Sequence, residues 1–257
     1  MGVLDALYIG AAGVSNLTFP DPSEDHKPMN AFETPEPDEL LPSGDARGTA
    51  QAPIFGRRQG YRPLVAFDFD GTLTRRDSFL AFLKWHIGPA RYAAIMASLA
   101  PATIKWVVDR DRGRLKAAVV SKFLRGIERE TLARRARDFA TEESQALLRP
   151  DALRCWKQWQ AQGARLVIVT ASPEILIAPF AHGLGADHLI ATRLAFDDHD
   201  CLTGALVGNN WRGLEKVRRL QALFGADLRL EAAYGDSAGD HEMLAIAEES
   251  GLKVFGA

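Results

Sequence analysis

The stretch on which the fold depends reads Leu64-Val-Ala-Phe-Asp68-Phe-Asp70-Gly-Thr-Leu-Thr74. Its short apolar start is typical of a strand that is buried in a parallel sheet. Asp68 and Asp70 are two positions apart, so they point the same way in an extended backbone. Burying two such charges is costly unless they bind a metal or take part in chemistry. An aspartate that only capped the next helix would explain one of them, but not a pair that flanks a phenylalanine. The stretch therefore predicts a functional site at the end of a buried strand.

Further apolar runs and helical patterns alternate along the rest of the chain. Apolar runs stand at residues 166–169, 228–234 and 253–255, and helical patterns at residues 150–162, 173–183, 213–224 and 240–249. This alternation predicts an α/β fold whose parallel sheet lies between helices on both faces. Polar residues cluster just after the strands, which is where open α/β sheets place their ligand site.

The chain divides into three expected parts. Residues 75–149 break the alternation, because they contain long helical stretches and no clear strand. We expect a helical cap at residues 83–149, inserted after the first strand. The α/β core is then formed by residues 61–82 and 150–257, and residues 1–60 form a tail.

The tail differs from the body in composition. Residues 1–60 contain 9 acidic and 4 basic side chains and 7 of the 13 prolines. Such a segment buries too little apolar surface to offset the entropy of ordering it, so we expect disorder. The alternative is a short docking helix around Leu4, Leu7 and Tyr8. The net charge of the whole chain is −2, which argues against a nucleic-acid partner.

The expected cap is basic. From Trp85 to Arg137 there are 12 Lys or Arg against 4 Asp or Glu. Its uncharged stretch, residues 92–104, is shorter than the roughly 20 residues of a membrane-spanning helix. The cap is therefore either an amphipathic surface that rests on anionic lipid or a lid whose apolar face packs on the core. The two cysteines, Cys155 and Cys201, form no disulfide framework, which is typical of a cytoplasmic protein.

Four motifs in order make the sequence resemble the haloacid-dehalogenase-like hydrolases. The first is the Asp-x-Asp-x-Thr pattern that begins at Asp68, and the second is Thr170 at the end of the second apolar run. Lys216 in Gly213-Leu-Glu-Lys216 is the third, and Gly235-Asp236-Ser-Ala-Gly-Asp240 is the fourth. The resemblance covers residues 62–257 and implies a Rossmann-like three-layer core with a cap.

The resemblance also implies phosphate chemistry that uses Mg2+. A phosphate ester repels a carboxylate nucleophile, so a cation and hydrogen-bond donors must offset its charge. Asp68, the carbonyl of Asp70 and Asp236 would hold the Mg2+ ion. Asp68 would be the nucleophile that forms an aspartyl-phosphate, and Asp70 would protonate the leaving oxygen and then deprotonate the attacking water. Asp240 would orient Lys216 or the waters on the metal.

The remaining implied residues contact the substrate phosphate. Thr170 would donate a hydrogen bond to a phosphoryl oxygen, and Lys216 would offset its charge. Gly71, Thr72 and Ala171 complete the expected substrate-binding set. Dehalogenases resemble the first motif but lack the second aspartate, so Asp70 indicates phosphoryl transfer to water.

The cap decides which substrate is expected. A helical insertion after the first motif resembles the phosphoserine-phosphatase-like branch, and a basic, partly apolar one resembles the bacterial phosphatidylglycerophosphatase C branch. We therefore expect a phospholipid-headgroup phosphomonoester as substrate, in a cytoplasmic enzyme that contacts the inner face of the membrane. A soluble substrate such as phosphoserine is the alternative. A membrane-surface binding module with a vestigial catalytic site is the alternative from another class.

Overall fold

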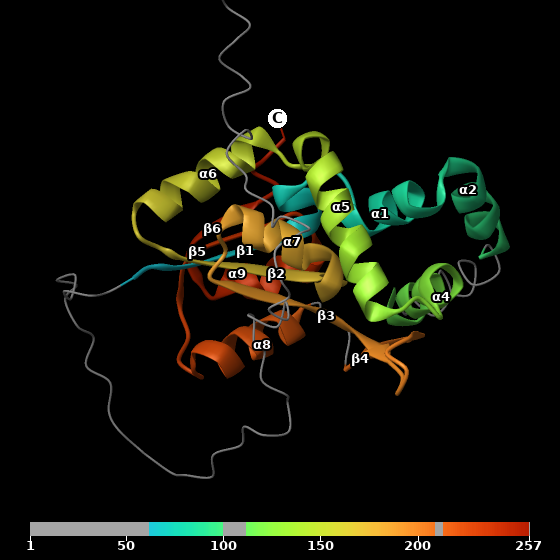
Figure 1. Ribbon diagram of the computed structural model, residues 1–257. Helices are drawn as coiled ribbons and strands as arrows, with labels where there is room; N and C mark the ends of the chain where they lie inside the picture. Colours follow the sequence, from blue (N-terminus) through green and yellow to red (C-terminus); the bar gives the residue numbers. More distant parts are fainter. Residues whose placement is uncertain (1–61, 100–111, 209–212, 257) are drawn as a thin grey trace, which may run out of the picture.

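A six-stranded sheet forms the centre of the computed structural model, which describes residues 62–99, 112–208 and 213–256. The strands lie in the order β4-β3-β2-β1-β5-β6 (Figure 1). Their bounds are β1 Leu64–Phe67, β2 Arg165–Pro173, β3 His188–Phe196, β4 Leu202–Val207, β5 Leu230–Gly235 and β6 Ala247–Leu252. The expected α/β fold is thereby confirmed.

β1 lies in the middle of the sheet and sets the position of the site. It pairs in parallel with β2 on one side and β5 on the other. The carboxyl ends of the three strands therefore meet at one edge of the sheet, as parallel pairing requires. Asp68, the residue after β1, continues this pairing, because its N–H donates to the Tyr234 carbonyl at 2.9 Å.

Helices cover both faces of the sheet, and β1 shows how the layers form. Val65 and Phe67 pack on one face, in a core that includes Trp156 and Phe180. Ala66 points to the other face, into a cluster with Leu220. The helices of the first face are α6 (Pro150–Ala161) and α7 (Glu174–Leu184), and those of the second are α8 (Leu214–Phe224) and α9 (His241–Ala245). Alternating side chains thus bury β1 from both sides.

Two expectations about the last helix and the last strand of the chain are wrong. The last strand is Ala247–Leu252 rather than residues 253–255, and the helix expected over residues 240–249 ends at Ala245. β6 is an edge strand with mostly exposed side chains, held by backbone pairing to β5, so no apolar run marks it. At the other edge β4 runs antiparallel to β3, so the sheet is not wholly parallel.

Four described α-helices lie between β1 and α6. They are α1 (Ser78–Ile87), α2 (Pro89–Ser98), α4 (Arg112–Leu124) and α5 (Arg129–Leu147). α5 packs on α7 of the core, where the Phe139 and Phe180 rings lie 6.0 Å apart, and α4 packs on β4. Both connections to the core run side by side, because Arg75 N donates to the Leu147 carbonyl and Arg149 N to the Leu73 carbonyl. The expected boundary at residue 83 falls inside α1, and the division into core and cap stays a prediction.

Some expectations concern residues outside the described ranges. These are the tail expected to be disordered, residues 1–60, and the last five residues of the uncharged stretch, 100–104. Within the described ranges, no helix combines the length and apolarity needed to cross a membrane.

Candidate active site

The turn after β1 brings the first motif against the end of β5. Gly71 has a φ of +80°, in the left-handed region that favours glycine. A Cβ atom at Gly71 would lie only 2.1 Å from Asp236 Oδ2. Glycine is therefore needed both for the turn and for the close approach of the Asp236 carboxylate.

Lys216 places a buried ammonium at the centre of the site. Its side chain is 3% exposed and comes from the first turn of α8. Its Nζ atom donates to Asp68 Oδ1 at 2.6 Å, to Asp240 Oδ1 at 2.6 Å and to the Val169 carbonyl at 2.9 Å. Three acceptors match the three N–H bonds of an ammonium, so Lys216 is fixed in place.

Asp240 is fully engaged by its neighbours. Its Oδ1 atom accepts from Lys216, and its Oδ2 atom accepts from the Ser237 N–H at 3.0 Å and the Ser237 hydroxyl at 2.9 Å. The Asp236 N–H also approaches Oδ2, at 3.3 Å. These contacts fit the expected role of Asp240 as the residue that orients Lys216.

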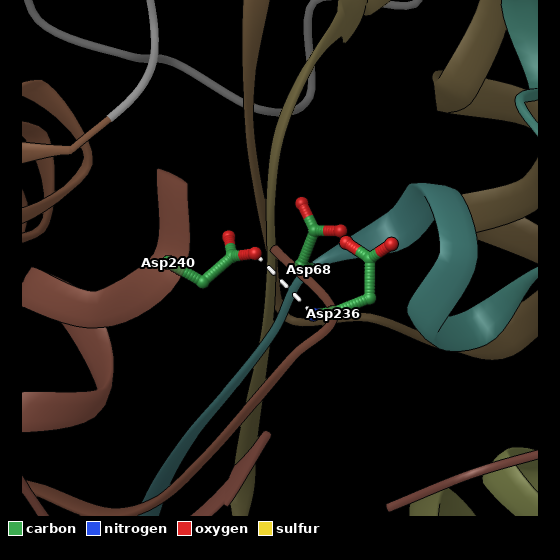
Figure 2. Close-up of side chains that lie close together, drawn as sticks. All are labelled: Asp68, Asp236 and Asp240. Carbon is green, nitrogen blue, oxygen red and sulfur yellow. Dashed lines mark hydrogen bonds between the residues drawn. The ribbon is translucent and has the colours of Figure 1, made fainter. Parts of the chain in front are cut away.

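Three carboxylates gather where β1 and β5 end, and Figure 2 shows their arrangement. Oxygen atoms of Asp68, Asp236 and Asp240 all lie within 4.8 Å of one another. Asp68 Oδ2 accepts only a long 3.4 Å hydrogen bond from Thr72, and no described residue donates to the Asp236 carboxylate. Asp68 and Asp236 therefore offer the hard oxygen ligands that Mg2+ prefers. The carbonyl of Asp70 as a third ligand stays a prediction.

Burial and charge set the protonation of this cluster. Burial raises the pKa of the Asp68 carboxyl to about 7, although the nearby Lys216 ammonium opposes the shift. Burial tends to lower the pKa of Lys216, but the charges and hydrogen bonds of Asp68 and Asp240 outweigh burial and raise this pKa. For Asp240, burial is outweighed by the charge and hydrogen bonds of Lys216, which lower its pKa. Lys216 and Asp240 thus stay ionised, and a divalent cation would keep Asp68 ionised as well.

The second strand brings two hydroxyls to the site. Thr170 is buried, and its Oγ1 atom accepts from the Ser172 N–H at 3.1 Å, which leaves the hydroxyl proton available to a ligand. Ser172 donates its own hydroxyl to Asp70 Oδ2, and the Ser78 N–H donates to Asp70 Oδ1 at 2.7 Å. Asp70 is thereby held between β2 and α1.

A cleft of about 260 Å³ opens above these groups. Most of the expected site residues line it, namely Asp68, Asp70, Thr170, Ala171, Lys216, Asp236 and Asp240. Gly71 and Thr72 are not part of this lining; the Gly71 N–H donates to Thr74 at 3.1 Å, and Thr72 is buried. Substrate contacts from Gly71 and Thr72 stay predictions.

The cleft also contains residues that the sequence did not single out. Asp77, Lys116, Ser172 and Ser237 complete the lining. Lys116 extends from α4 and donates to the Ala171 carbonyl, while its ammonium lies 5.7 Å from the centre of the Phe79 ring. Asp77 caps α1 by accepting from the Leu80 N–H at 2.8 Å. Lysines and aspartates are frequent on helices, so no sequence signal marked this pair.

The chain is similar in sequence to a family of hydrolases and to two named proteins. The family model described as haloacid dehalogenase-like hydrolase matches residues 65–245. Protein CicA of Caulobacter vibrioides is 54% identical over 208 residues, which cover 80% of this chain and 93% of that protein. The inhibition of morphological differentiation protein of Streptomyces azureus is 28% identical over 194 residues, covering 71% and 68%.

The fold also recurs among solved structures. A protein of Bordetella pertussis Tohama I superposes with a TM-score of 0.61 at 23% identity, over 74% of this chain and 88% of that one. At this identity the likeness concerns the fold. The family match covers more than half of the sequence and shows that this chain belongs to the haloacid dehalogenase-like hydrolases. The order of the motifs, the carboxylate cluster and the fold agree with this assignment.

Proposed function

We propose that this protein is a Mg2+-dependent phosphomonoester hydrolase that acts through a phosphorylated Asp68. The observation that carries the proposal is the buried Lys216 ammonium, which binds one oxygen of Asp68 and leaves the other available beside Asp236. A cation on Asp68 and Asp236 would supply charge that offsets the phosphate and would hold it against the nucleophile.

The first half-reaction transfers the phosphoryl group to the protein. The Asp68 carboxylate, which Lys216 holds in place through Oδ1, attacks phosphorus as the bond from phosphorus to the leaving oxygen breaks. Asp70 gives its proton to that oxygen, which leaves as an alcohol. The Thr170 hydroxyl proton and the Lys216 ammonium stabilise the negative charge on the phosphoryl oxygens.

The second half-reaction returns the protein to its starting state. Asp70 takes a proton from a water molecule, whose oxygen attacks phosphorus as the bond to the Asp68 carboxylate breaks. Inorganic phosphate then leaves the cleft, and Asp70 is protonated for the next cycle.

For the substrate, we propose phosphatidylglycerophosphate, bound by a protein that sits peripherally on an anionic membrane surface. The basic composition between Trp85 and Arg137 supports it, because anionic lipids attract such segments. Lys116 brings one of these positive charges from α4 into the cleft itself, where it can pair with the phosphodiester of that headgroup.

A soluble phosphomonoester such as phosphoserine is the second candidate. It is favoured by the presence of both Asp77 and Lys116 in the cleft lining, because an acidic and a basic side chain suit an ammonium and a carboxylate on one small molecule. Opposite charges in the substrate would thus find complementary groups beside the phosphate site.

The deciding experiment is a phosphate-release assay on the full chain. We expect turnover with Mg2+, loss of turnover with excess EDTA, and recovery when Mg2+ is restored. Phosphatidylglycerophosphate in mixed micelles should exceed phosphoserine in kcat/KM by at least about tenfold, which corresponds to about 1.4 kcal/mol of differential transition-state binding. If kcat/KM for phosphoserine were instead about tenfold higher, phosphoserine would replace the lipid as the proposed substrate. If no phosphomonoester released phosphate in the presence of Mg2+, the hydrolase proposal would be wrong.

A further inference from the structure

Asp70 is held by two donors of different kinds. Its Oδ1 atom accepts from the Ser78 backbone N–H at 2.7 Å, and its Oδ2 atom accepts from the Ser172 hydroxyl. Ser172 lies in β2 and is 2% exposed, whereas Ser78 begins α1. The two oxygens of Asp70 therefore have different surroundings, and each is tied to a different element.

The chemistry of the two donors separates the oxygens further. A backbone N–H can only donate, so Oδ1 is restricted to accepting and gains nothing from carrying a proton. A hydroxyl can donate or accept, so the Ser172 hydroxyl can serve Oδ2 whether that atom is bare or protonated. Oδ2 is the oxygen whose hydrogen-bond partner tolerates both states of a proton carrier.

We propose that Ser172 is the positioning residue of the acid–base group, and that it makes Asp70 Oδ2 the atom that carries the catalytic proton. The proposal rests on the proposed function, since it concerns the proton that Asp70 moves. When the leaving group departs, the O–H bond on Asp70 Oδ2 breaks and a new O–H bond forms on the leaving oxygen.

A second contact links Ser172 to the phosphate side of the cleft. Its backbone N–H donates to Thr170 Oγ1 at 3.1 Å, and Thr170 is the hydroxyl expected to contact a phosphoryl oxygen. One residue thus holds the proton carrier with its side chain and the phosphate-binding hydroxyl with its backbone. A shift at Ser172 would alter the distance between the proton and the leaving oxygen, on which proton transfer depends.

The test compares two substrates of nearly the same shape that differ in how much they need a proton. Phenyl phosphate releases a basic oxygen that benefits from protonation, and p-nitrophenyl phosphate releases a far better leaving group. We expect Ser172→Ala to lower kcat/KM for phenyl phosphate by about tenfold or more, a fraction of the 10²–10⁴-fold that acid–base catalysis contributes. For p-nitrophenyl phosphate the loss should stay below about threefold.

Matched variants separate positioning from folding. Ser172→Thr keeps the hydroxyl and should restore kcat/KM for phenyl phosphate to within about threefold of the unaltered protein. Ser144→Ala removes another buried serine hydroxyl, on α5 and outside the cleft, and should change neither substrate. If Ser172→Ala does not fold, Ser172→Cys offers a side chain of similar size with a weak donor for the same comparison.

The outcomes distinguish this inference from the proposed function. Equal losses on both substrates, or no loss on either, would overturn the role of Ser172 while the phosphatase proposal stands. If the unaltered protein hydrolyses neither compound with Mg2+, the phosphatase proposal fails and the role of Ser172 falls with it.

Discussion

Asp68→Asn is expected to abolish phosphate release while the protein stays folded. The asparagine has nearly the same size and can still accept the Lys216 hydrogen bond through its amide oxygen. It lacks the charge and the nucleophilic oxygen that would form the aspartyl-phosphate. Loss of a nucleophile costs on the order of 10⁴-fold or more in kcat, which is the largest effect on turnover that we expect from one substitution.

The measurement is phosphate release from p-nitrophenyl phosphate with saturating Mg2+, together with the circular dichroism spectrum of the variant. Asp198→Asn is the matched control, because Asp198 is exposed and does not line the cleft. We expect that variant to retain full turnover. Turnover by Asp68→Asn within tenfold of the unaltered protein would show that another group attacks phosphorus.

Lys216→Met is expected to produce the largest loss of stability. Methionine fills much of the same space, but it leaves Asp68 and Asp240 buried without their shared cation. Removing one partner of a buried ion pair costs about 3–5 kcal/mol of unfolding free energy. Because the two carboxyl groups can avoid this cost by taking up protons, the loss should be smaller at pH 5 than at pH 8.

Urea denaturation at the two pH values checks this expectation. Arg218→Met, on the same helix, removes a cation that is 71% exposed and should change the unfolding free energy by less than about 0.5 kcal/mol. If Lys216→Met were as stable as Arg218→Met at pH 8, the ammonium would not be what compensates the carboxylates.

The meeting of the polar site residues could be predicted from sequence because parallel strands end at the same edge. Asp68 and Asp236 each follow a strand and Thr170 lies near the carboxyl end of β2, and because β1 lies between β2 and β5 these residues meet at one edge. Lys216 was predictable through its motif, although a lysine near the start of a helix carries little signal on its own. These residues combine an unusual polar type with a position next to an apolar run.

Apart from β3, a mostly buried strand that the sequence analysis also did not predict, the parts that sequence reasoning missed have no such signal. Ser172 and Lys116 are ordinary residues whose contacts with the cleft appear only when β2, α1 and α4 are placed together. β4 and β6 are edge strands whose pairing uses backbone atoms, and β6 is mostly exposed, so its hydrophobic pattern is weak. Local sequence thus shows what must be buried, and contacts between distant segments have to be seen in the structure.

The central claim is that Asp68 carries the phosphoryl group between the two half-reactions, and its most direct test is to trap and locate that group. Asp70→Asn should still be phosphorylated by p-nitrophenyl phosphate, whose leaving group needs no proton, but it should lose the base that activates water. After an acid quench, mass spectrometry of the digested variant should find one phosphoryl group per chain, on the peptide that contains Asp68. The modification should be removed by hydroxylamine, as expected of an acyl phosphate. A phosphoryl group on another residue, or continued turnover by this variant without a phosphorylated protein, would contradict the account.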